Sequence, residues 1–166
     1  MPTNILSFLL LSVSLVFSCV HSDTFPTDPL NTKDQAYFKG IFSNLPPKYS
    51  LTKQEESIVI YKLFAPWCSS CLEEISQLKI LQKKFKDDKN LKIILVSISP
   101  INSRKYSSSF PSFFEKNILE KSRKKQIPQT YIFFKGELKL RFIRPYNFEK
   151  KEIFTTLTQY ARDASI

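Results

Sequence analysis

Apolar residues in the middle of the chain form two continuous runs separated by a helically spaced stripe. The runs Ser57–Ala65 and Leu91–Ser99 are rich in β-branched residues and predict strands buried on both faces. Between them, apolar residues recur every three or four positions across Ser69–Lys86, which predicts a helix with one face in the core. This order of strand, helix and strand is typical of a parallel crossover.

The rest of the chain predicts further elements of both kinds. In order, we expect a loop over Pro100–Ser109, a helix over Phe110–Lys121, a strand over Thr130–Phe134, a turn at Lys135-Gly136, a strand over Glu137–Ile143, and a helix that Asn147 caps and that runs to about Ala164. The resulting order, β-α-β-α-β-β-α, combines parallel crossovers with a terminal hairpin. It predicts an α/β fold with a central mixed sheet flanked by helices.

The N-terminal third is patterned differently. Residues 1–22 carry no charge, and their apolar core, Ile5–Phe17, is shorter than the roughly 20 residues of a membrane-spanning helix but fits an export signal. Residues 23–55 have weak periodicity, so we expect an N-terminal segment with at most one helix or short strand. Residues 56–166 then form the main domain, since a chain of 166 residues allows one domain.

The leader leaves three outcomes open. The residues Val16-Phe17-Ser18-Cys19 resemble a bacterial lipobox, which would make Cys19 the lipidated first residue of the mature protein. Simple cleavage after Ser22 and retention as an uncleaved membrane anchor are the alternatives. All three carry the body out of the cytoplasm, to a periplasm or cell surface where disulfides persist. We expect a membrane-anchored lipoprotein, with a secreted soluble protein as the alternative.

Composition excludes several kinds of site. Two glycines far apart cannot form a phosphate-binding loop or a dinucleotide fingerprint. The single histidine, His21, argues against a Ser-His-Asp triad, a multi-histidine zinc site and a copper-delivery site. We therefore expect neither a metal nor an organic cofactor.

The chain is strongly basic, with 25 Lys and Arg against 15 Asp and Glu and a net charge of +10. Most of the lysines are mixed with acids along amphipathic segments, and the densest basic cluster is Lys121-Ser122-Arg123-Lys124-Lys125. We interpret this pattern as a solvated surface, with attraction to anionic membranes or partners as the alternative. We expect no nucleic-acid site.

The chemistry is concentrated at Cys68-Ser69-Ser70-Cys71, where the first strand meets the first helix. Cys68 meets the unpaired N–H groups at the positive end of the helix, which stabilise its thiolate. Cys71 lies one turn further on, within disulfide reach. Such a pair can attack a disulfide and then resolve the mixed species. A purely structural disulfide is the alternative; a zinc half-site would find only Cys19 and His21, both in the leader, as further ligands.

Two charged residues near this motif are unusual. Glu74 falls on the core-facing stripe of the helix, where desolvation should raise its pKa. It is either a proton acceptor for Cys71 or a carboxylate at the edge of the stripe that reaches water. Lys62 lies inside the apolar strand. It either pairs with Glu74 or stabilises the Cys71 thiolate, or it extends past the strand to solvent.

A further signal is Ile127-Pro128, directly before the third expected strand, because a proline there marks a strand start or a cis bond. Together these motifs resemble the thioredoxin superfamily over about residues 57–160. The matching residues are Phe64-Ala65-Pro66-Trp67-Cys68-Ser69-Ser70-Cys71, Ile127-Pro128 and Phe134-Lys135-Gly136.

Within the superfamily the chain is most similar to the exported, membrane-tethered TlpA/ResA/DsbE group. Cys68 and Pro128 are 60 positions apart, which fits that group's insertion between the C-x-x-C helix and the proline strand. The stretch Pro128–Ile132 and the position of Glu74, three after Cys71, also match. The chain departs from the superfamily at Lys62, where thioredoxins carry a buried aspartate, and from the group at Ile75, where it usually has a proline.

The resemblance and the motif together predict the site. Cys68 is expected to be the nucleophile, Cys71 the resolving thiol and Glu74 the group that manages the proton. Trp67, Ile127 and a cis Pro128 would form the surface that receives the substrate. The expected function is an exported thiol–disulfide oxidoreductase that exchanges disulfides with proteins as a reductant. Its electrons would come from a membrane donor or another thiol protein. The alternative is a non-enzymatic thioredoxin-fold binding lipoprotein with a structural Cys68–Cys71 disulfide.

Overall fold

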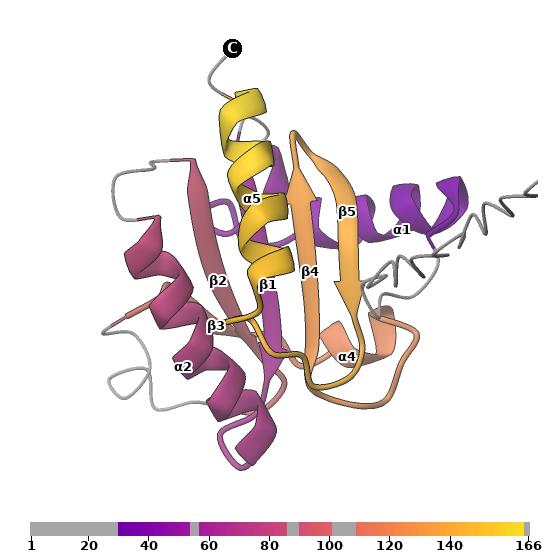
Figure 1. Cartoon of the computed structure of the whole chain (residues 1–166). Helices are drawn as coiled ribbons and strands as arrows, with labels where there is room; N and C mark the ends of the chain where they lie inside the picture. Colours follow the sequence, from indigo (N-terminus) through magenta and orange to yellow (C-terminus); the bar gives the residue numbers. More distant parts are fainter. Residues whose placement is uncertain (1–29, 54–56, 86–89, 101–108, 165–166) are drawn as a thin grey trace, which may run out of the picture.

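The computed structural model describes residues 30–53, 57–85, 90–100 and 109–164. The leader with Cys19 and most of the expected loop over Pro100–Ser109 lie outside the described residues. The centre of the molecule is a five-stranded sheet in the order β3-β2-β1-β4-β5 (Figure 1). The strands are β1 (Ile58–Phe64), β2 (Leu91–Ser97), β3 (Ser112–Phe114), β4 (Gln129–Phe134) and β5 (Glu137–Phe142). The helices are α1 (Thr32–Ser43), the short 3-10 helix η1 (Leu51–Lys53), α2 (Ser69–Lys84), α4 (Ile118–Lys121) and α5 (Lys151–Ala164).

The sheet is mixed, as the sequence predicted. β1 pairs in parallel with β2, and β2 in parallel with β3. β4 is antiparallel to both β1 and β5. The hairpin turn expected at Lys135-Gly136 is confirmed, because both residues have positive φ angles, 49° and 73°, as a tight two-residue turn requires.

Helices cover both faces of the sheet, so every residue of β1 is buried. α2 and α5 lie on one face, and α1 lies behind the other in Figure 1. Alternate residues of β1 serve the two cores: Ile58, Ile60 and Phe64 face α2 and α5, whereas Val59 and Tyr61 face α1. Lys62 belongs by this alternation to the α2 face, which contains the cysteine motif.

The N-terminal segment contains a well-defined helix. Asn31 caps α1 by accepting a hydrogen bond from the Asp34 N–H at 2.8 Å. Phe42 stacks on Tyr61 with ring centroids 4.3 Å apart, and Phe38 lies 5.2 Å from the Tyr131 ring. These aromatic contacts attach α1 to the sheet face opposite the cysteine motif.

The single helix expected over Phe110–Lys121 is wrong. The segment instead forms the edge strand β3 and then the one-turn helix α4. Pro111 would lie in the first turn of that helix, where proline is tolerated, so the difference comes from pairing of this segment with β2. The Pro111 carbonyl accepts from the Leu95 N–H at 3.0 Å, which extends the sheet ladder.

The prediction for the last helix was also partly wrong. α5 begins at Lys151, and the Asn147 side chain accepts from the Glu149 N–H at 2.9 Å, so Asn147 closes the preceding turn instead of capping the helix. In the part of the chain that the structure describes, we find no helix of the length and apolarity that a membrane crossing needs.

Candidate active site

The cysteine motif lies at the end of the central strand. β1 ends at Phe64, the Cys68 N–H donates to the Ala65 carbonyl at 3.1 Å, and α2 begins at Ser69. Cys68 is the N-cap of α2, and its Sγ accepts a hydrogen bond from the Cys71 N–H at 3.2 Å. The sulfur therefore lies where the helix concentrates unpaired N–H groups and partial positive charge.

The two cysteines form a disulfide and differ in exposure. Their Cα atoms are 5.2 Å apart, and Cys68 is 8% exposed whereas Cys71 is fully buried. Trp67, the residue before Cys68, is 72% exposed, so its indole lies on the surface and is not part of the core. Of the two cysteines, only Cys68 therefore has any exposed surface.

The proline motif lies at the same edge of the sheet. The Ile127–Pro128 bond is cis, Ile127 is half-buried and Pro128 is buried. The antiparallel register pairs Leu63 with Gln129. Pro128, the residue before Gln129, therefore lies opposite the end of β1, from which the chain continues into the cysteine motif. The two motifs, about 60 positions apart in sequence, border the same end of the fold.

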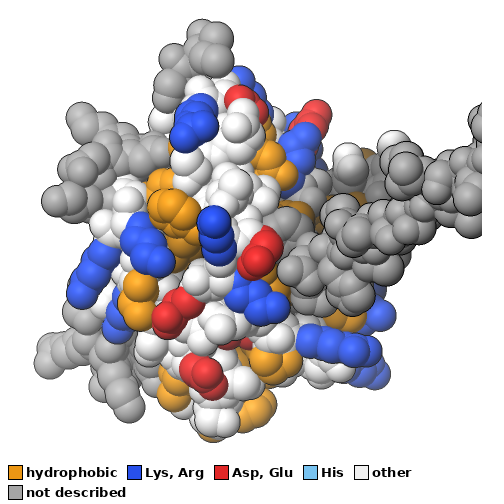
Figure 2. All heavy atoms as spheres, in the orientation of Figure 1, with side chains coloured by type: hydrophobic (Ala, Val, Ile, Leu, Met, Phe, Trp, Pro, Cys, Tyr) orange, Lys and Arg blue, Asp and Glu red, His pale blue; other side chains and the backbone are white. Residues whose placement is uncertain are grey.

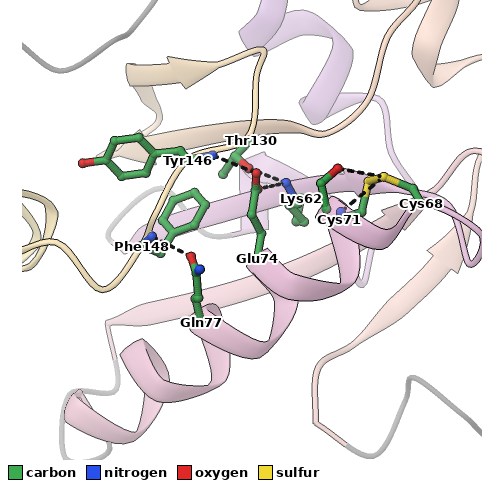
Figure 3. A network of polar contacts seen from close by, with 9 residues as sticks. Lys62, Cys68, Cys71, Glu74, Gln77, Thr130, Tyr146 and Phe148 are labelled. Carbon is green, nitrogen blue, oxygen red and sulfur yellow. Dashed lines mark hydrogen bonds and ion pairs between the residues drawn. A yellow bond between two sulfur atoms is a disulfide. The ribbon is translucent and has the colours of Figure 1, made fainter.

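Glu74 and Lys62 form a buried ion pair behind the disulfide, in the network shown in Figure 3. Lys62 has no exposed surface and Glu74 is 2% exposed, so the alternatives in which either side chain reaches solvent are wrong. The Lys62 Nζ also lies 3.1 Å from Thr130 Oγ1. The other carboxylate oxygen of Glu74 accepts from the Tyr146 backbone N–H at 2.9 Å.

Comparison with known proteins identifies the architecture. No protein-family model and no curated protein sequence matches this chain. Solved structures do match. A secreted thiol-disulfide isomerase from Corynebacterium glutamicum has a TM-score of 0.56 at 14% identity, over 68% of this chain and 75% of that one. A thiol:disulfide interchange protein of the thioredoxin family from Chlorobium tepidum has a TM-score of 0.55 at 15% identity, over 68% and 86%. The thioredoxin domain of a thiol-disulfide oxidoreductase from Bacteroides vulgatus has a TM-score of 0.54 at 17% identity, over 67% and 84%. The chain has the thioredoxin fold.

On this thioredoxin fold, burial sets the proton affinities of the ion pair. Desolvation raises the pKa of Glu74, and the attraction of Lys62 and the hydrogen bonds to the carboxylate oppose that rise. Desolvation likewise lowers the pKa of Lys62 from its usual 10.5 to about 8, against the attraction of Glu74. The pKa of each group thus lies nearer to neutral pH than it would in water.

A pocket of about 230 Å³ opens to solvent beside the Glu74 carboxylate. It is lined by Ser70, Glu73, Glu74, Gln77, Pro145, Tyr146 and Asn147.

Sequence reasoning missed three groups that build this site. Thr130 and the Tyr146 N–H complete the hydrogen bonding of the ion pair, and the Gln77 side chain accepts from the Phe148 N–H at 2.8 Å. Thr130 lies opposite Lys62 in the register of β4 with β1, so a correct strand pairing would have located it. The backbone donors leave no signal in a sequence.

Proposed function

We propose that the protein is an exported thiol–disulfide oxidoreductase that exchanges disulfides with protein substrates through Cys68 and Cys71 and acts as a reductant. The observation that carries this proposal is the Cys68 Sγ at the N-cap of α2, hydrogen-bonded to the Cys71 N–H and lying beside an exposed Trp67. A disulfide with a purely structural role does not need a helix N-terminus that stabilises a thiolate at its more exposed cysteine.

The proposed reaction uses the two sulfurs in sequence. In the reduced protein, the Cys68 thiolate attacks a substrate disulfide, forms a mixed disulfide and releases one substrate thiolate. The Cys71 thiolate then attacks the Cys68 sulfur, closes the Cys68–Cys71 bond and releases the second substrate thiolate. Two electrons pass to the substrate, and a membrane donor or another thiol protein supplies the electrons that restore the dithiol. Trp67, Ile127 and Pro128 would contact the substrate chain around the attacked sulfur.

We expect brief iodoacetamide treatment of the reduced protein to alkylate Cys68 before Cys71. Cys68 keeps 8% of its surface exposed and lies at the positive end of the helix, whereas Cys71 is fully buried. Peptide mass spectrometry after quenching measures the order of labelling, and the same treatment of the oxidised protein is the control. Preferential labelling of Cys71 would reverse the two roles.

Glu74 is proposed to accept the proton of Cys71 when that thiol attacks. A raised pKa brings the carboxylate closer to the pH at which a general base works best. We expect Glu74→Gln to slow exchange by about 10–100-fold, near the low end of general-base contributions, because the helix also assists thiolate formation. Stopped-flow exchange from pH 5 to pH 9 measures the effect. Glu73→Gln is the matched control, since Glu73 is the exposed neighbour of Glu74. A Glu74→Gln profile that overlays wild type throughout would rule out this role.

The cell envelope is the proposed location, and Cys19 is the proposed lipidated N-terminus. The support is the short uncharged leader followed by Val16-Phe17-Ser18-Cys19. We expect the mature protein to begin at Cys19 and to sediment with membranes, held by acyl chains with help from the basic body. N-terminal mass spectrometry of the membrane and soluble fractions tests this, with Cys19→Ala as the control. A soluble protein that begins at Asp23 would contradict it.

A further inference from the structure

The connection between α4 and the proline motif is held in place by hydrogen bonds from the side chain of Gln129. Gln129 is fully buried, and its side-chain amide lies 3.1 Å from Ser122 Oγ, 2.9 Å from the Lys124 carbonyl and 2.7 Å from the Gln126 carbonyl. The Tyr131 hydroxyl donates to the other end of the same amide at 2.6 Å, which fixes its orientation. Residues 122–126 are therefore a preorganised loop.

Lys124 and Lys125 are exposed on this loop and Arg144 is exposed on the connection after β5, and we name these three cations the basic lip. The Gln126 side chain donates to the Ile143 carbonyl at 2.8 Å, which joins the loop to the residue before Arg144. Among the described residues, no carboxylate lies within ion-pair distance of the basic lip.

The two neighbouring cations are already engaged with the protein itself. Lys121 pairs with Glu115 at 3.3 Å. Arg123 pairs with Asp34 at 3.4 Å and stacks on the Tyr37 ring at 3.7 Å. Lys121 and Arg123 are also exposed, so the basic lip differs from them in having no carboxylate partner among the described residues.

The basic lip lies next to the motif that borders the disulfide. Ile127-Pro128 follows the loop directly, and the strand register brings Pro128 to the end of β1 from which the cysteine motif starts. Figure 2 shows Lys and Arg side chains gathered at the lower right, over α4 and the connection that follows it, at the same lower end of the molecule as the start of α2 in Figure 1. A chain that reaches Cys68 across Pro128 would therefore pass the basic lip.

We propose that the preferred substrates are acidic polypeptide segments, with Asp or Glu flanking the target disulfide, which the basic lip attracts and orients. This inference rests on the proposed exchange function and names its substrate class. Opposite charge beside a reactive site raises the rate of encounter, and salt weakens the effect because the groups are exposed. A protein surface fits better than a lipid surface because Lys124 and Lys125 lie within four residues of Pro128, at the end of the sheet from which the cysteine motif starts.

The test uses two synthetic peptides that each contain one internal disulfide and differ only in the flanking residues, Glu in one and Ser in the other. The protein is reduced first, and the excess reductant is removed. We expect wild type to reduce the Glu peptide about tenfold faster than the Ser peptide at low ionic strength, with the ratio falling in roughly 0.5 M salt. In Lys124→Gln/Lys125→Gln/Arg144→Gln the ratio should fall to about one.

A matched variant separates the basic lip from net charge. Lys39→Gln/Lys83→Gln/Arg162→Gln removes the same charge from three exposed positions, and it should keep the wild-type ratio. Lys39 lies near Glu137 at the β4–β5 turn. Lys83 lies in the last turn of α2, and Arg162 lies in the last turn of α5 near the β4–β5 turn, so all three are at the opposite end of the sheet.

The other outcomes separate the two proposals. Equal rates for the two peptides in wild type, or equal loss of the ratio in both triple variants, would overturn the acidic-substrate proposal and leave the exchange function standing. No reduction of either peptide would contradict the exchange function itself. Equal peptide rates together with vesicle binding that only the basic-lip variant loses, measured on phosphatidylserine vesicles, would identify an anionic lipid as the partner and overturn the proposal.

Discussion

Cys68→Ser is expected to abolish disulfide exchange, whereas Cys71→Ser is expected to accumulate mixed disulfides with substrate. The N-cap sulfur of Cys68 makes the first bond, and without the sulfur of Cys71 no second thiol in the described part of the chain is left to release it. Electrophoresis without reductant, with mass spectrometry of the trapped species, measures both results.

The chain offers a control for these cysteine variants. Ser70→Ala changes a residue between the cysteines, whose hydroxyl lies 3.5 Å from the Cys68 Sγ, and it should neither abolish exchange nor trap a partner. Trapping by Cys68→Ser instead of Cys71→Ser would exchange the assigned roles. Full activity of Cys68→Ser would remove Cys68 from the reaction.

The second large effect concerns stability. Lys62→Met is expected to lower the free energy of unfolding by about 3–5 kcal/mol, the usual loss when one partner of a buried ion pair is removed. Methionine fills similar space, so the loss comes from leaving the buried Glu74 carboxyl group without its cationic partner and not from a cavity. Urea denaturation at pH 7 measures it. Lys62→Met/Glu74→Gln should recover most of the loss, because the introduced amide stays neutral and its oxygen can still accept from the Tyr146 N–H.

The loss in Lys62→Met should shrink as the pH falls. Burial raises the pKa of Glu74 above its ordinary 4.5 and Lys62 opposes the rise, so removing Lys62 raises that pKa further. Above pH 4.5 the unfolded chain releases this proton while the folded variant retains it, so the variant loses stability as the pH rises through that window. Denaturation at pH 4.5 and pH 7 should show the larger difference from wild type at pH 7. If the difference in unfolding free energy between variant and wild type were independent of pH, the Glu74 carboxyl group would not be the cause of the loss.

The sequence predicted the elements whose hydrophobic pattern is long and regular. β1, α2, β2, β4, β5 and the last helix all come from patterns of five or more residues, and burial of those patterns leaves few alternatives. β3 was missed because three residues are too few to show a period, and its pairing with β2 depends on a partner distant in sequence. Its neighbouring apolar residues, Phe110 and Ile118, then resembled a helical stripe.

The site was predictable where the chemistry is local and not where it is tertiary. Cys68 and Cys71 lie on one turn, so their spacing and the strand–helix junction are enough to locate the motif. The choice between pairing and solvent exposure for Lys62 and Glu74 depends on how closely α2 packs on β1. That packing, like the hydrogen bonds from Gln129 to the loop before the proline, follows from the assembled sheet.

The reduction potential of the Cys68–Cys71 couple tests the central claim most directly. The protein is equilibrated in glutathione buffers of defined potential, and the dithiol fraction is counted by mass spectrometry after rapid alkylation. An exchanging pair should equilibrate and give a midpoint above about −300 mV, within reach of thiol reductants. A bond that resists these buffers, with a potential below about −300 mV, would be a structural disulfide and would contradict the proposed oxidoreductase.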